Sequence, residues 1–248
     1  MRQLEFTVLA QQRLTREVYR LSLQGDASDI TAPGQFVDLA IPGFFLRRPI
    51  SVCDWDSRGL TLIYKRAGLG TAALSALQPG EKVDLLSGLG NGFSLAEAGS
   101  RPLLVGGGVG TPPLYGLARR LLQSQGCRPV VLLGFNQADQ VFYAEEFAAL
   151  GLEVTVSTLD GSAGRPGLVT DILPELEYSY IYACGPRPML AALQRQADPG
   201  CGGQFSLEER MGCGFGACMG CTCQTREGAK RLCVDGPVLR REEILWQS

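Results

Sequence analysis

The chain has 248 residues, enough for two small domains with an additional module. Hydrophobic residues make up 45% and charged residues 19%, with a formal net charge of −2, a balance that favours neither a nucleic-acid-binding nor a membrane surface. The chain contains no histidine, which excludes a Ser-His-Asp triad, a Rieske centre and a His-ligated catalytic zinc.

Residues 1–99 are predicted to form an antiparallel β-barrel. Short segments rich in β-branched and aromatic residues alternate there with turns that contain Gly and Pro, a pattern typical of a small closed barrel. The predicted strands are Glu5–Ala10, Val18–Leu23, Phe36–Ile41, Leu60–Lys65 and Lys82–Leu86. A short helix is predicted over Thr71–Leu77.

Two segments of this barrel are candidates for binding a cofactor. Arg48-Pro49-Ile50-Ser51 falls between two predicted strands, and its Arg offers charge and paired donors for a phosphate and for the edge of a flavin ring. Gly70 and Thr71 lie at the start of the helix, where free N–H groups favour a pyrophosphate. Taken singly, the first could be structural and the second only a helix cap. Their order on one chain favours the cofactor interpretation.

Residues 100–200 are predicted to form an α/β domain with a parallel sheet covered on both faces, because apolar strands alternate with helical segments. The predicted strands are Leu103–Val105, Val130–Gly134, Val154–Thr158 and Tyr180–Ala183. The predicted helices are Leu114–Gln123, Glu145–Leu150 and Pro188–Ala197.

This second domain carries two candidate dinucleotide motifs. Gly106-Gly107-Gly108-Val109-Gly110 joins a strand to a helix with Pro in its first turn, which favours a phosphate site, although Thr111 replaces the usual third Gly. Cys184-Gly185-Pro186 follows the last strand, where it could lie against a nicotinamide ring or be a plain turn. Gly134-Phe135-Asn136-Gln137-Ala138 lacks an Arg to meet a 2′-phosphate, which favours NADH over NADPH.

Residues 201–248 are predicted to form a small cluster-binding domain, because Gly and Cys dominate a segment with little core of its own. Cys213, Cys218 and Cys221 form a C-x4-C-x2-C pattern followed by Cys233, which is the ligand spacing of a plant-type [2Fe–2S] cluster. Such a cluster passes electrons one at a time. A zinc knuckle is the alternative, since C-x2-C is also a zinc spacing.

The other cysteines are not expected to bind the cluster. Cys223 is predicted to be a bystander, and Cys53, Cys127 and Cys201 to be ordinary thiols. An odd number of unevenly spaced cysteines, with no signal peptide and no apolar run long enough to span a membrane, predicts reduced thiols in a cytoplasmic protein.

Taken in this order, the motifs resemble the ferredoxin-NADP-reductase superfamily, which pairs a flavin barrel with a nicotinamide domain. The cluster segment, from Glu209-Arg210-Met211-Gly212-Cys213 to Cys233-Val234-Asp235-Gly236-Pro237-Val238, narrows the resemblance to electron-transfer subunits of class 1B dihydroorotate dehydrogenases. The resemblance implies that FAD binds to Arg48, Pro49, Ile50, Ser51, Ile63, Tyr64, Lys65, Gly70 and Thr71. It implies NAD(H) at Gly106, Gly107, Gly108, Gly110, Cys184, Gly185 and Pro186, and the cluster on Cys213, Cys218, Cys221 and Cys233.

The resemblance also implies a relay between NAD(H) and the FMN of a separate dihydroorotate dehydrogenase subunit, by way of FAD and [2Fe–2S], in a heterotetramer that serves pyrimidine biosynthesis. We find no acid–base set for pyrimidine chemistry in this chain, so no catalytic residue is assigned and that chemistry is expected on the partner. Two alternatives remain: a subunit of a hydrogenase, sulfide dehydrogenase or bifurcating transhydrogenase with the same cofactors, and a zinc-binding interaction protein.

Overall fold

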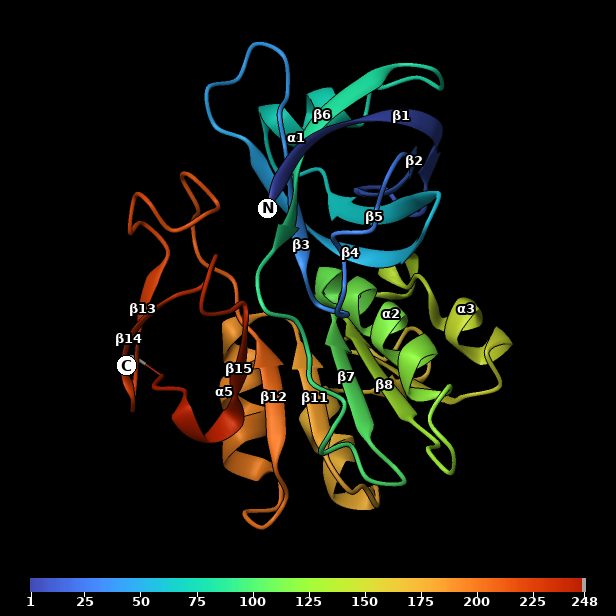
Figure 1. The fold of residues 1–248 in the computed structure, drawn as a ribbon. Coiled ribbons are helices and arrows are strands. Elements are labelled where there is room, and N and C mark those ends of the chain that lie inside the picture. Colours follow the sequence, from blue (N-terminus) through green and yellow to red (C-terminus); the bar gives the residue numbers. More distant parts are fainter. Residues whose placement is uncertain (247–248) are drawn as a thin grey trace.

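The computed structural model describes residues 1–246, which form a β-barrel, an α/β layer and a C-terminal module beside them (Figure 1). The barrel is closed in the order β1-β2-β5-β4-β3-β6, and all of its neighbouring strands are antiparallel. Its elements are β1 (Arg2–Arg13), β2 (Val18–Gln24), β3 (Phe36–Leu39), β4 (Arg48–Asp56), β5 (Gly59–Lys65), α1 (Leu69–Leu74) and β6 (Lys82–Leu89). The antiparallel barrel predicted from the sequence is thus confirmed.

Strand β4 is the barrel element that the sequence prediction missed. It begins at Arg48, so Arg48–Ser51 is the start of a strand that pairs with β3, not a connection between strands. Pro49 is tolerated there because it lies second in the strand, opposite Asp38. The strand places the candidate flavin motif on the barrel wall.

The α/β layer is a seven-stranded sheet in the order β10-β9-β8-β7-β11-β12-β15. Its neighbouring strands are parallel except for the edge strand β15, which pairs antiparallel with β12. The strands are β7 (Leu103–Gly107), β8 (Val130–Phe135), β9 (Glu153–Thr158), β10 (Arg165–Pro166), β11 (Ile181–Cys184), β12 (Gly203–Ser206) and β15 (Val238–Arg240). The helices are α2 (Thr111–Leu121), α3 (Ala144–Ala149), α4 (Val169–Ile172) and α5 (Arg187–Gln196).

Side chains that alternate along the strands separate two cores. Leu104 and Tyr182 pack with α2 and α3 on one face, whereas Leu103 and Ile181 pack with α4 and α5 on the other. Both faces are therefore covered by helices, as predicted. Among residues 1–246, no helix combines the length and the apolar character needed to cross a membrane.

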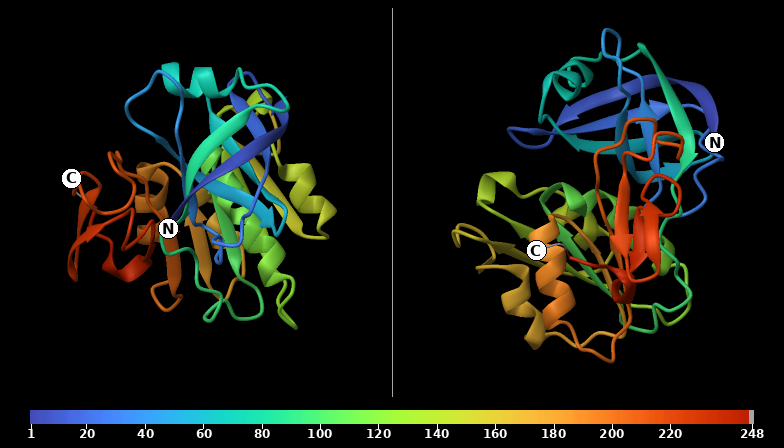
Figure 2. Two further views of the ribbon diagram at one scale, coloured as in Figure 1. Left: turned by 45° about the horizontal axis from the view of Figure 1, so that its top comes forward. Right: turned by 90° about the vertical axis from the view of Figure 1, so that its left-hand side faces the viewer.

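The last part of the chain contributes to the sheet as well as to a separate module. Strands β12 and β15 complete the central sheet, although both lie beyond the expected boundary at residue 200. The hairpin of β13 (Thr222–Thr225) and β14 (Gly228–Arg231) lies outside it, next to the sheet and the barrel (Figure 2). The strands predicted from the sequence thus stop short of this edge of the sheet, because β12 and β15 are only four and three residues long.

The barrel and the α/β layer contact each other through β4 and α2. Gly116 of α2 approaches the barrel so closely that a Cβ atom there would lie 2.7 Å from the carbonyl oxygen of Cys53. Arg119 of α2 also forms an ion pair with Asp54 of β4. These contacts fix the barrel over the carboxyl ends of the sheet strands, where ligands bind in open α/β folds.

Candidate cofactor sites

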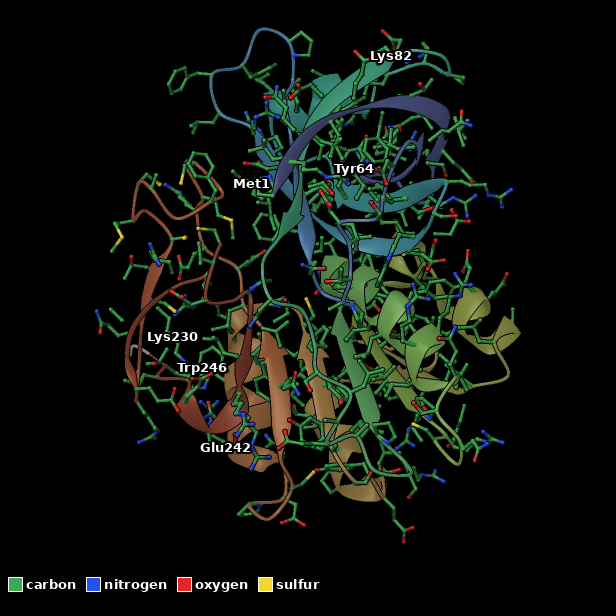
Figure 3. All side chains as sticks on the ribbon, in the orientation of Figure 1. Met1, Tyr64, Lys82, Lys230, Glu242 and Trp246 are labelled. Atoms are coloured by element: carbon green, nitrogen blue, oxygen red, sulfur yellow. The ribbon has the colours of Figure 1, made fainter. Side chains whose placement is uncertain are left out.

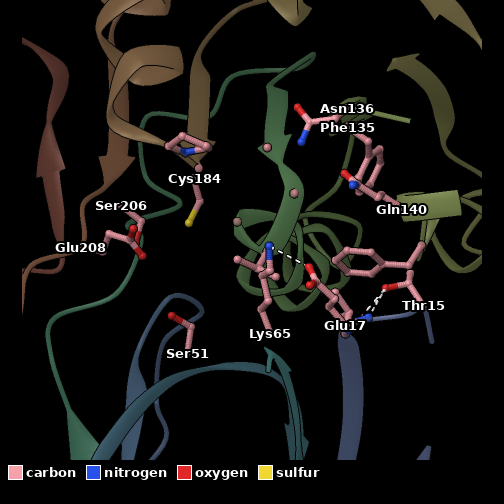
Figure 4. A pocket seen from close by; sticks show the side chains of 18 of the residues that line it. Thr15, Glu17, Ser51, Lys65, Phe135, Asn136, Gln140, Cys184, Ser206 and Glu208 are labelled. Carbon is pink, nitrogen blue, oxygen red and sulfur yellow. Dashed lines mark hydrogen bonds and ion pairs between the residues drawn. The ribbon is translucent and has the colours of Figure 1, made fainter. Parts of the chain in front are cut away.

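A cavity of about 560 Å³ lies between the barrel and the carboxyl ends of the sheet strands (Figure 4). It brings together three predicted motifs that are far apart in the sequence. The predicted residues on its wall are Pro49, Ser51 and Lys65 from the barrel, Gly107, Gly108 and Gly110 from the glycine loop, and Cys184, Gly185 and Pro186 from the turn after β11. The volume lies within the usual range for ligand pockets.

The glycine loop and the Cys184–Pro186 turn touch each other along their backbones. Gly106 pairs with Cys184 across β7 and β11. A Cβ atom at Gly110 would lie 2.1 Å from the carbonyl oxygen of Cys184, and one at Gly107 would lie 2.9 Å from Cδ of Pro186. Only glycine fits at these positions, so the two motifs form one continuous surface.

Gly106 lies in β7 behind this surface and does not line the cavity. A Cβ atom there would lie 2.9 Å from Oγ1 of Thr111, the residue that departs from the usual fingerprint. Thr111 is fully buried, and its Oγ1 has no hydrogen-bond partner among the described residues. The third-glycine position is thus occupied by a small side chain that packs against the first glycine.

Arg48 and the start of α1 form a second subsite next to the cavity. A Cβ atom at Gly70 would lie 2.5 Å from Nε of Arg48, so the guanidinium covers the first turn of the helix. Thr71 Oγ1 accepts hydrogen bonds from the N–H groups of Ala67 and Gly68, at 2.9 and 3.1 Å. A cation beside a helix N-terminus fits a phosphate. The two barrel segments predicted to bind an anion therefore lie together.

Three of the predicted flavin residues do not expose their side chains to the cavity. Ile63 and Tyr64 are 4% and 2% exposed within hydrophobic cores, and Ile50 packs against the barrel core. Figure 3 shows Tyr64 within the barrel, where its hydroxyl oxygen accepts a hydrogen bond from Gln11 Nε2 at 2.5 Å. Ile63 and Tyr64 can therefore meet a cofactor only through their backbone, whereas the side chain of Ile50 is half-buried. Lys65, the next residue, lines the cavity and pairs with Glu17 at 3.0 Å.

The segment after β12 contributes cavity residues that the sequence analysis did not assign. Ser206, Glu208, Glu209 and Met211 line the cavity, and the same segment continues to Cys213. Figure 4 shows Ser206 and Glu208 beside Cys184. The available signal was Gly203–Ser206, a buried run that precedes them, since residues after a strand of this sheet face the ligand side.

The thiol of Cys184, at the carboxyl end of β11, is neutral. Burial raises the pKa of this thiol to about 12. A hydrogen bond with Ser206 has the opposite, smaller effect. The thiol is therefore a small apolar group on the cavity wall and not a charged nucleophile.

The four predicted cluster ligands fall into two pairs. The backbone N–H of Cys218 donates to Sγ of Cys213, and the backbone N–H of Cys233 donates to Sγ of Cys221, each at 3.4 Å. Cys218 is exposed, Cys213 is partly exposed, and Cys221 and Cys233 are buried. Within residues 1–246, no three Cys, Asp or Glu side chains converge closely enough to hold a single metal ion. Two thiol pairs fit a two-iron cluster, whose irons need two thiolates each.

The loop between the first two ligands favours anionic sulfur. Burial would raise the pKa of Cys213, but N–H donors from Cys218 and Phe215 lower it to about 6. Burial and the neighbouring sulfur of Cys221 raise the pKa of Cys233 to about 12. Gly214, with a φ of +77°, lets the loop turn its N–H groups toward sulfur. The donor set and the loop thus fit an iron–sulfur cluster.

Asn91, which the sequence analysis did not single out, holds the segment that carries Cys233. Its backbone N–H donates to the carbonyl of Gly236 at 2.7 Å, and its Nδ2 donates to the carbonyl of Val238 at 2.7 Å. Its Oδ1 accepts from the N–H of Val238 at 3.1 Å. Asn91 follows the last barrel strand, so it ties the barrel to the cluster module.

Two family models match the chain. The model described as the iron-sulfur cluster binding domain of dihydroorotate dehydrogenase B covers residues 208–245, and the model of an oxidoreductase NAD-binding domain covers residues 104–195.

Relatives match over nearly the full length. The dihydroorotate dehydrogenase B (NAD(+)) electron transfer subunit of Geobacillus sp. (strain WCH70) is 44% identical, covering 99% of each chain. The subunit of the same name from Bacillus caldolyticus is 47% identical, covering 96% of this chain and 97% of that one.

Solved structures share the fold. The NADH-dependent reduced ferredoxin-NADP oxidoreductase, from work on flavin-based electron bifurcation, has a TM-score of 0.89 at 29% identity, covering 97% of this chain and 90% of that one. Phthalate dioxygenase reductase has a TM-score of 0.66 at 18% identity, covering 82% of this chain and 67% of that one, a likeness of fold alone.

Proposed function

The chain belongs to the family of dihydroorotate dehydrogenase B electron transfer subunits, and on this premise we propose that it relays electrons between NAD(H) and a catalytic subunit in pyrimidine biosynthesis. In this proposal the electrons pass through FAD and a [2Fe–2S] cluster on this chain. The cluster exchanges them with the FMN of a dihydroorotate dehydrogenase subunit, with which the chain forms a heterotetramer. The chemistry on dihydroorotate belongs to that partner.

The observation that carries the proposal is the shared cavity. Residues from the flavin motif and from the nicotinamide turn line the same space, and the segment from Ser206 to Cys213 runs from its wall to the cluster loop. A hydride donor, a flavin and a one-electron acceptor can therefore lie next to one another. This order is the one that a relay between a two-electron and a one-electron carrier needs.

The residues of the chain hold and shield these groups. Backbone N–H groups of the glycine loop bind the dinucleotide phosphates, and the Cys184–Pro186 turn places a neutral thiol against the reacting ring. Arg48, with the N–H groups at the start of α1, neutralises the FAD phosphates. Bound FAD supplies the exchange between hydride and single-electron transfer.

We propose the following assignment of residues. FAD is held by Arg48, Pro49, Ile50, Ser51, Ile63, Tyr64, Lys65, Gly70 and Thr71, of which Ile63 and Tyr64 act through their backbone. NAD(H) is held by Gly106, Gly107, Gly108, Gly110, Cys184, Gly185 and Pro186, of which Gly106 acts through packing. The cluster is held by Cys213, Cys218, Cys221 and Cys233, and Cys223 is a bystander.

The domain division into residues 1–99, 100–200 and 201–248 stays a prediction. Because β12 and β15 hydrogen-bond within the central sheet, we propose that both belong to the nicotinamide domain. The cluster module would then comprise residues 208–237, between these strands.

The partner is proposed to cover the cluster loop. Phe215 and Met219 are 46% and 55% exposed, and they flank the exposed ligand Cys218. Exposed apolar side chains around a cluster ligand support a contact with another protein at this surface. The partner would shield them and bring its flavin close to the cluster.

Co-expression with a dihydroorotate dehydrogenase catalytic subunit tests the proposal. The complex should reduce NAD with electrons from dihydroorotate, and the isolated chain should show a flavin spectrum and a reduced [2Fe–2S] electron paramagnetic resonance (EPR) signal. A chain that contains zinc and no iron would contradict it.

A second candidate function uses the same cofactors with another partner, and the TM-score of 0.89 to a bifurcating reductase favours it as the alternative. Mass spectrometry of the proteins that co-purify with the chain distinguishes the two. A partner that contains no FMN and does not oxidise dihydroorotate would support the second candidate function.

A further inference from the structure

Strand β3 is buried on both faces and still contains a carboxyl group. Val37 and Leu39 point into the barrel core, whereas Phe36 packs in the core that also contains Cys221 and Cys233. Asp38 shares the face of Phe36 and is 1% exposed. Burying a charged group without a partner costs free energy.

Asp38 contacts the cluster loop directly. A Cβ atom at Gly214 would lie 2.5 Å from Oδ2 of Asp38. Gly214 follows the ligand Cys213, so the carboxyl group is held against the first turn of the loop. Its Oδ1 has no hydrogen-bond partner among residues 1–246.

The two nearest cations are occupied elsewhere. Arg47 forms an ion pair with Asp84 at 2.5 Å, and it reaches Asp38 only through the backbone carbonyl, at 3.1 Å. Arg48 donates to the carbonyls of Leu46 and Arg47, at 2.5 and 3.1 Å, beside the proposed FAD phosphate site. Within the described residues, Asp38 therefore has no ion-pair partner. Burial raises the pKa of its carboxyl group to about 7, so the group is charged above that pH, where its charge acts on what lies next to it.

We propose that Asp38 sets the reduction potential of the cluster, because its carboxylate lies against the Cys213 loop and disfavours an added electron there. The potential of such clusters depends on nearby net charge and on burial, and a charge acts strongly in a site of low dielectric. A lower cluster potential favours transfer from the cluster to FAD, the step toward NAD that dihydroorotate oxidation requires. The inference rests on the proposed cluster and deepens the proposed relay.

The test compares neutral replacements at one position. Asp38→Asn keeps the shape of the side chain and Asp38→Ser is smaller, so at least one avoids a clash with Gly214. The full chain, with FAD and cluster bound, is titrated potentiometrically at pH 8.5, and the reduced cluster is followed by EPR. At a fixed potential the ratio of reduced to oxidised cluster is expected to rise about tenfold, which corresponds to ~59 mV for a one-electron centre.

Asp56→Asn is the matched control, because it also removes a barrel carboxylate, but an exposed one that pairs with Arg58. It should shift the ratio much less than either Asp38 variant. An unchanged cluster potential in a fully loaded Asp38 variant overturns the inference, as does loss of cluster from both variants while FAD is kept, which shows a purely structural role. Absence of the [2Fe–2S] signal from the wild-type chain would instead overturn the proposed function.

Discussion

At the scale of single residues, close backbone approach decides where a ligand can lie. The glycine loop and the nicotinamide turn form one surface because Gly110 leaves no room for a side chain against Cys184. The neighbouring Gly108 differs: it has a φ of +50°, but open space surrounds the position of its Cβ atom. Substitutions at Gly110 and Gly108 therefore distinguish the effect of a steric clash from the effect of backbone strain.

Gly110→Ala is expected to weaken NADH binding at least tenfold, because the added methyl group must push the loop away from the turn. Gly108→Ala should cost only about 1 kcal/mol of strain and bind NADH within a few-fold of wild type. Titration of the oxidised flavin spectrum with NAD+, which occupies the NADH site without reducing the flavin, measures the relative affinities. Equal losses in the two variants would contradict the close-contact argument.

Arg48 is the charged residue of the proposed FAD phosphate site. Arg48→Ala should weaken FAD binding by about 10- to 100-fold, since a hydrogen bond to a charged group contributes about 1.5–3 kcal/mol. FAD content after dialysis and fluorescence titration of the apo chain measure the loss. Arg58→Ala, at an exposed position of the same barrel, is the control. If Arg48→Ala retains FAD as well as wild type does, Arg48 does not contribute to FAD binding.

At the scale of elements, the cluster loop distinguishes ligands from neighbouring thiols. Cys218→Ser should lose the [2Fe–2S] cluster, whereas Cys223→Ser, on β13, should keep iron, sulfide and the EPR signal at wild-type levels. Serine preserves the shape of the side chain and removes the soft donor that iron needs. Iron and sulfide analysis with EPR gives the result, and a loaded Cys218→Ser chain together with an empty Cys223→Ser chain would reverse the assignment.

Asn91, which follows the last barrel strand, hydrogen-bonds to the segment that carries Cys233. Asn91→Ala removes hydrogen bonds to the backbone of Val238, which should cost about 2 kcal/mol and speed the loss of cluster to a chelator. Gln123→Ala, at an exposed position after α2, should leave the rate unchanged. A chelation rate in Asn91→Ala equal to wild type would show that the cluster itself holds the segment.

The missed strands show what local patterns can and cannot predict at this scale. Long segments such as Val130–Phe135 are apolar throughout, so β8 could be recognised from its own residues. β12 and β15 are short, and they are strands because the edge of an existing sheet offers them partners. The sequence analysis did not predict β4 because this strand begins with Arg48-Pro49, which locally indicates a turn.

At the scale of the whole molecule, one hydrophobic core joins the three parts. It contains Phe36 and Leu89 from the barrel, Leu103 from the sheet, and Cys221 and Leu232 from the cluster module. A module built into a shared core is not expected to unfold alone.

A cluster-free chain tests this coupling. Cys218 is exposed, so Cys218→Ser disturbs the core only through the loss of the cluster. The variant should unfold at a lower temperature than wild type, and FAD should be released in the same transition, because binding stabilises only the folded state. Calorimetry and flavin fluorescence measure the two events. An FAD release temperature equal to wild type would show that the module is independent.

The sequence by itself determined the order of the three parts, the cluster ligand set expected at Cys213, Cys218, Cys221 and Cys233, and the class of reaction, because spacing and residue type are local properties. Only the tertiary structure placed Arg48 over Gly70, the glycine loop against Cys184, and Asp38 against Gly214. It also showed that Ile63 and Tyr64 point into hydrophobic cores. These facts depend on which strands pair and which faces meet, and no local pattern contains that information because each contact joins residues distant in the chain.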